Sequence, residues 1–86
     1  MRIRSIKPEF WKSERVASLP RDSRLLFIGL WNLADDAGRF RAHPNLIQGE
    51  LFPYEPEADV AGWLQALVDA GLVLLYEADG RRYGLV

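Results

Sequence analysis

The longest apolar segment of the chain lies at 24–40, where polar residues hardly interrupt the pattern before Asp35. A helix that is apolar around its whole circumference has to be buried on nearly every side, so the other elements are expected to pack around it. We place this central helix from about 21 to 34. Asp22 or Ser23 is its expected N-terminal cap, because short oxygen-bearing side chains accept hydrogen bonds from free amides of the first turn.

The residues before the central helix predict an arm and a first helix. Charged and apolar residues alternate over 1–7, which predicts a short strand or an extended arm across the core, with its basic side chains facing outward. Residues 8–19 predict a helix, because Pro8 stands in an opening turn where its missing N–H costs little and Pro20 ends the segment. The expected buried contacts of this helix are Phe10, Trp11, Val16 and Leu19.

A turn and a brief strand are expected after the central helix. The sequence DDAG at 35–38 predicts a turn in which Gly38 has a positive φ and the aspartates accept hydrogen bonds from nearby amides. Adjacent carboxylates also allow a metal or acid–base site, but no residue with ligand or catalytic spacing accompanies them. The turn is therefore the favoured interpretation. Residues 39–41 predict a strand with Phe40 inward and both arginines outward.

Two more helices and a hairpin complete the expected fold. One helix begins at His43 and Pro44 and reaches 51, with Leu46, Ile47 and Leu51 facing the core. The segment 52–56 connects it to the next helix, and Phe52 and Tyr54 are expected to fill the core there. From 57 to 70 an amphipathic stripe is formed by Val60, Trp63, Leu64, Leu67 and Val68. Gly71 ends that helix, and 72–77 and 81–86 predict a hairpin around the turn 78–80.

Composition limits the domain organisation and the location. With 86 residues, 49% of them hydrophobic, the chain fits one domain, 1–86, in which an arm and helix at 1–19 precede a core at 20–86. There is no cysteine, no apolar run of membrane-spanning length and no secretory signal. We therefore expect a soluble, cytoplasmic protein without a membrane partner. The chain ends within an expected strand, which favours the N-terminal part of a longer protein.

Catalytic chemistry finds little support in the sequence. Cysteine, a glycine-rich phosphate loop and a serine in a nucleophile-elbow context are all missing. The single histidine, His43, has no partner at useful spacing and is interpreted as a helix-entry residue. We therefore expect a protein that is not an enzyme, with no metal, no cofactor and no small-molecule substrate.

The expected element order identifies a fold. Without the first helix, the order is that of an α+β winged helix-turn-helix, mostly helical, with an additional N-terminal helix and a C-terminal β-hairpin as the wing. The chain also resembles the N-terminal winged-helix domains of phage replication initiators and replisome organisers, the group with DnaD-like partners. The matching residues are FW at 10–11, RLLFIGLW at 24–31, ADDAGRF at 34–40, ELFPY at 50–54, LVDAGL at 67–72, Tyr76 and Tyr83.

The resemblance implies a DNA-binding domain that helps to start phage genome replication in the cytoplasm of a bacterial host. It also implies that the helix at 57–70 enters the major groove of double-stranded DNA. This helix carries Glu57, Asp59 and Asp69 but no Lys or Arg, so phosphates would repel it. Gln65 alone has the chemistry to read an adenine edge.

Basic residues elsewhere are the candidates for phosphate contacts. Residues 1–41 carry nine Lys and Arg against five acids, whereas 42–86 carry two against seven. A local stripe of arginines produces an attractive field whatever the net charge, which is −1. The candidates are Arg81 and Arg82 on the wing and Arg2, Arg4, Lys7, Arg39 and Arg41 at the front of the chain.

A rival hypothesis is a protein-interaction or self-association module that uses the winged-helix fold without strong DNA binding. It is favoured by the acidic helix, by the small residues Ala61 and Gly62 on its outer face, and by the free edge of the apolar strand at 72–76. The expected partner is then a second copy of the chain or a host replication protein.

Overall fold

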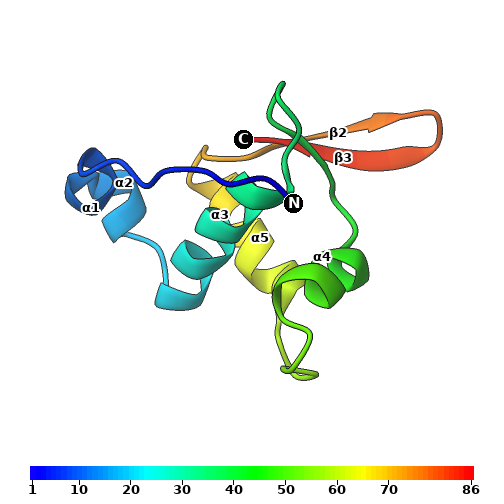
Figure 1. Cartoon of the computed structure of the whole chain (residues 1–86), viewed down its shortest axis with the longest axis horizontal. Helices are drawn as coiled ribbons and strands as arrows, with labels where there is room; N and C mark the ends of the chain where they lie inside the picture. The colour runs from blue at the N-terminus through cyan, green and yellow to red at the C-terminus, as the bar shows by residue number, and fades with distance from the viewer.

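The computed structural model describes residues 1–86 as five helices and a three-stranded antiparallel sheet, which confirms the expected α+β class. The helices lie together on one side of a long hairpin that extends away from them (Figure 1). In chain order the elements are α1 Glu9–Lys12, α2 Glu14–Ala17, α3 Arg21–Leu33, β1 Arg39–Arg41, α4 Pro44–Leu51, α5 Val60–Asp69, β2 Leu74–Ala78 and β3 Arg81–Leu85.

The sheet joins the middle of the chain to its end. Its strand order is β1–β3–β2, so β3 pairs with β2 in the hairpin and with β1 on its other side. Asp79 and Gly80 have φ angles of 53° and 74°, the positive values that a tight two-residue turn requires, and the predicted hairpin is confirmed. The strand β2 begins two residues later than expected because Leu72 N–H still caps α5, donating to Leu67 O over 3.0 Å.

The core forms where α3 crosses α5. Leu26 and Leu30 of α3 and Leu67 of α5 have no exposed surface. Only one stripe of α3 is fully buried, however, and Leu25 is 54% exposed. The expectation that α3 would be covered on nearly every side was therefore wrong, because so few other elements cannot surround a helix of 13 residues.

The N-terminal segment differs from the single helix expected at 8–19. Ser13 adopts an extended conformation with ψ 121° and separates α1 from α2, and its Oγ accepts a hydrogen bond from Val16 N at 3.3 Å. A serine side chain that caps a new helix competes with continuation of the old one. Phe10, Val16 and Leu19 are buried as expected, whereas Trp11 is 66% exposed, so its predicted burial was wrong.

Residues 1–7 form an extended arm and no strand. Arg2 N–H donates to Asn32 O at 2.8 Å, and Asn32 Nδ2 donates back to Arg2 O at 2.7 Å. These two bonds fasten the arm along the C-terminal part of α3 (Figure 1).

Several predicted caps and core positions also need correction. The helix α3 begins after Pro20 without a side-chain cap, and Ser23 is wholly buried instead of capping. The helix α5 begins three residues later than expected, at Val60, because Asp59 Oδ1 accepts from Gly62 N at 3.1 Å and so defines the first turn. Tyr54 is 94% exposed and does not fill the core. In α4, Ile47 is buried but Leu46 is 49% exposed.

Candidate nucleic-acid interface

The turn at 35–38 is built around the carboxylate of Asp35. Its Oδ1 accepts from the backbone N–H groups of Ala37 and Arg39, each at 2.9 Å, and its Oδ2 accepts from Arg39 Nε at 3.0 Å. The backbone hydrogen bond from Arg39 is the main reason that the pKa of Asp35 lies below its ordinary value; partial burial opposes this, and the other Arg39 and Ala37 contacts assist it. The aspartates thus form the predicted turn, with Gly38 at φ 82°, and no group of three or more potential metal ligands occurs in the chain.

The carboxylates of the same turn form ion pairs with several of the basic residues in the first half of the chain. Arg2 forms an ion pair with Asp36, and Arg4 NH2 lies 3.9 Å from the same carboxylate. Arg39 pairs with Asp35. Three of the arginines proposed for phosphate contact therefore already face a carboxylate. The ion pairs of Arg2 and Arg4 were missed because their partner, Asp36, is more than 30 residues away in the chain, and only the path of the arm along α3 brings them together.

Three other candidates, Arg41, Arg81 and Arg82, line a single cleft of about 270 Å³, although Arg81 and Arg82 are adjacent on β3 and start from opposite faces of the sheet. None of them takes part in an ion pair. The cleft lies where the hairpin meets the link between β1 and α4, and Ala42 N–H fixes that link by donating to Arg82 O at 3.1 Å. The remaining residues that line it are Ala42, His43, Pro44 and Gly80.

No residue that lines this cationic cleft is acidic. His43, which the sequence indicated only as a helix-entry residue, contributes to the cleft and also caps α4, because its Nδ1 accepts from Leu46 N at 3.4 Å. The histidine was therefore predicted correctly as the residue at which α4 is entered, whereas its capping hydrogen bond and its place beside the arginines were not predicted. The sequence did not indicate that His43 lies near Arg81 and Arg82, because β3 is brought next to β1 only by long-range strand pairing.

Arg41 has an unusual environment for a surface arginine. Its Nε is buried and has no hydrogen-bond partner, and its guanidinium carbon lies 5.8 Å from the centre of the Tyr83 ring. A cation held over an aromatic face keeps its charge while its orientation is fixed. Arg41 is only half-buried, so the expectation that it points fully outward was too simple.

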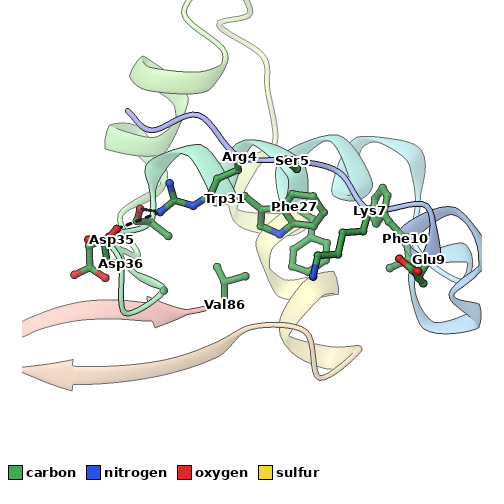
Figure 2. Close-up of a pocket in the computed structure, with 13 residues that line it drawn as sticks. Arg4, Ser5, Lys7, Glu9, Phe10, Phe27, Trp31, Asp35, Asp36 and Val86 are labelled. Atoms are coloured by element: carbon green, nitrogen blue, oxygen red, sulfur yellow. Dashed lines mark hydrogen bonds and ion pairs between the residues drawn. The ribbon is translucent and has the colours of Figure 1, made fainter.

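The last two candidates do not join the cleft. Gln65 lies on the exposed face of α5, where its Nε2 donates to Asp69 Oδ1 at 2.9 Å, so its amide is already engaged. Lys7 lies on the rim of a different pocket beneath the arm, of about 530 Å³ (Figure 2).

This arm pocket was not predicted. Phe10 and Trp31 have ring centres 5.4 Å apart, Phe27 and Trp31 5.2 Å apart, and all three line it. Figure 2 shows Lys7 reaching over the aromatic rings from the arm, with Val86 across the pocket. The four-residue spacing of Phe27 and Trp31 was the available signal, but the rings could equally have been core residues.

Comparison with protein-family models, with curated proteins and with solved structures found no match to this chain. None of its helices has the length and apolar character needed to cross a membrane.

Proposed function

We propose that the chain is a winged-helix domain that binds double-stranded DNA through its wing. The order of elements from α3 to β3, with β1 paired to β3, is the ground for the winged-helix assignment. In this assignment β2 and β3 form the wing, and the arm with α1 and α2 is an N-terminal addition. The proposal assigns no catalytic activity.

The observation that carries the proposal is the cationic cleft. Arg41, Arg81 and Arg82 line it without any carboxylate, whereas Arg2, Arg4 and Arg39 are paired with the turn aspartates. Guanidinium groups bind phosphate oxygens in a planar, two-point geometry, and release of counterions from DNA supplies most of the non-specific affinity. The cleft therefore suits a phosphate of the DNA backbone.

The proposed mode does not use α5 as the principal recognition helix. Its exposed residues Ala61, Gly62 and Gln65 carry no positive charge, and Asp69 adds a negative one. Because phosphate contacts position a protein without reading sequence, we expect binding with little sequence preference. The further assignment to phage replication initiation, in a bacterial cytoplasm, rests on the sequence resemblance alone.

The test compares two double variants that remove the same charge. Arg81→Ala with Arg82→Ala removes two arginines of the cleft, and Lys12→Ala with Arg21→Ala removes two exposed cations outside it. Affinity for a short labelled duplex is measured by fluorescence anisotropy at several salt concentrations. The cleft variant is expected to bind more weakly, and its slope of log affinity against log salt is expected to be shallower by about 1.8, or 0.9 for each lost phosphate contact.

The control variant is expected to keep the slope of the unmodified protein. Equal weakening in both variants would show that net charge alone matters, and unchanged affinity of the cleft variant at low salt would remove the wing from the interface.

A second candidate function is self-association through the edge of the sheet. The strand β2 is paired on one side only, and Leu74 on it is 62% exposed. An open apolar edge is a template for pairing with another strand. Light scattering across a wide concentration range tests this candidate: Leu74→Lys should dissociate any dimer, and a protein that stays monomeric throughout excludes it.

A further inference from the structure

One face of the sheet carries a row of three side chains from three strands. Arg41 of β1 is paired with Tyr83 of β3, and Tyr83 is paired with Tyr76 of β2. Successive residues of a strand point to opposite faces, so this row lies opposite the buried Phe40, whose ring packs over Gly84. The row therefore belongs to the face of the sheet that does not contact the core.

The three side chains form a stack with one open end. The rings of Tyr76 and Tyr83 are 5.7 Å apart and inclined by only 21°, and Arg41 lies 5.8 Å from the Tyr83 ring. Tyr83 thus has a neighbour along the sheet on each side. Tyr76, which is half-buried, has Tyr83 on one side and no neighbouring strand on the other, because β2 pairs only with β3.

A groove of about 570 Å³ crosses this face from the end of α3 to the tip of the hairpin. Besides the stack, it is lined by Leu33, Asp35, Arg39, Phe40, Ala78 and Asp79. Asp35 is neutralised by its pair with Arg39, which leaves Asp79 at the tip as the one unpaired carboxylate of the groove. Arg81, two residues before Tyr83 on the same strand, projects from the same face and has no ion pair.

We propose that this sheet face binds single-stranded nucleic acid, with one base stacked on the face of Tyr76 that is turned away from Tyr83 and with phosphates further along the strand held by Arg81 and Arg41. A sheet face that carries an aromatic ring at its edge and arginines elsewhere supplies the two elements of such binding, a stacking platform and a cationic track. The duplex has its bases already stacked and does not offer one to Tyr76. Single-strand binding can be tested separately from duplex binding through Tyr76, because Tyr76 does not line the cationic cleft.

The test uses the full chain, a labelled oligothymidine of about 12 nucleotides, and anisotropy at low salt. Tyr76→Leu keeps an apolar side chain but removes the ring, and we expect its affinity to fall by roughly 5- to 150-fold, since stacking contributes about 1–3 kcal/mol per base. Tyr76→Phe keeps the ring and should retain the affinity. Tyr54→Leu is the matched control, because Tyr54 is 94% exposed in a connection remote from the sheet, and its affinity should be unchanged.

An abasic strand of equal length separates stacking from phosphate contact. The unmodified protein should bind it more weakly than oligothymidine. This comparison uses no variant, so it holds even if Tyr76→Leu folds poorly. Oligouridine in place of oligothymidine distinguishes RNA from DNA as the source of the strand. Tyr76→Leu should leave the affinity for duplex DNA unchanged, so failure of the single-strand proposal can be distinguished from failure of the duplex proposal.

Any one of the following results would overturn the proposal: full affinity of Tyr76→Leu for oligothymidine, equal affinity of the unmodified protein for the abasic strand and for oligothymidine, or a loss in Tyr54→Leu as large as in Tyr76→Leu. Light scattering of the same samples tests whether a second copy of the chain occupies this sheet face instead. The proposal would also be contradicted if the unmodified protein did not bind oligothymidine but self-associated through β2, and if Tyr76→Leu abolished that self-association.

Discussion

The contact between Phe40 and Gly84 fixes the sheet against the helices and therefore orients the hairpin of β2 and β3. Phe40 of β1 is 5% exposed, and its ring lies directly over Gly84, its partner residue on β3. A methyl group added at Gly84 would lie 2.8 Å from Cε2 of that ring and closer still to Cζ. Carbon atoms normally pack about 3.5–4.0 Å apart, so Gly84→Ala requires a buried ring to move.

Two effects of opposite sign decide the outcome of Gly84→Ala. Glycine inside a strand is less favourable than alanine by about 0.5–1 kcal/mol, so the substitution would stabilise the protein if the space were free. Overfilling a packed core costs about 1–3 kcal/mol. The contact with Phe40 should prevail, and the middle of the two ranges leaves a net loss of about 1 kcal/mol in the free energy of unfolding. For a domain of this size the thermal midpoint should fall by about 4–8 °C per kcal/mol.

Thermal and urea unfolding, followed by circular dichroism, measure this loss in Gly84→Ala, in Phe40→Leu and in the double variant. Since leucine leaves room for the new methyl group, the double variant should lose less than the sum of the single losses, by at least about 0.5 kcal/mol. A thermal midpoint of Gly84→Ala equal to or above that of the unmodified protein would refute the reasoning, as would strict additivity in the double variant.

Two further predictions concern the turn and α4. The folded-state pKa of Asp35 lies below the reference value of 3.8, so its carboxylate stabilises the fold above pH 3.8, and this contribution disappears as the pH falls through the lower folded value. Asp35→Asn should therefore lower the thermal midpoint at neutral pH and converge with the unmodified protein in strong acid; a constant difference across pH would contradict this. In α4 a methyl group at Gly49 would meet nothing within 4 Å, so Gly49→Ala should stabilise by about 0.5–1 kcal/mol, and a lowered midpoint would count against open space there.

Local patterns predicted the elements that depend on nearby residues. The stripe from Val60 to Val68, the glycine stop at Gly71 and the hairpin around Asp79 and Gly80 all follow from side-chain spacing and backbone preference over a few residues. The helix at 8–19 was wrong for an equally local reason, because Ser13 has a capping side chain in the middle of the segment. The apolar pattern did not reveal which side of α3 would stay exposed, since that depends on how many other elements the short chain supplies.

The candidate interface was predicted less well than the fold. Arg2, Arg4 and Arg39 looked equivalent to Arg41, Arg81 and Arg82 in the sequence, and only the structure separates the paired from the unpaired arginines. A residue's charge is a property of its chemistry, whereas its neutralisation depends on partners brought near by folding.

The sequence by itself determined the α+β class, the turn at 35–38, the entry of α4 at His43 and Pro44, and the lack of positive charge on α5. The tertiary structure alone decided that β3 lies between β1 and β2, and that pairing creates both the cationic cleft and the row of Arg41, Tyr83 and Tyr76. The physical reason is distance along the chain. Periodicity and turn chemistry act over a few residues, whereas both surfaces join side chains about 40 residues apart, and such contacts form only when the core has closed.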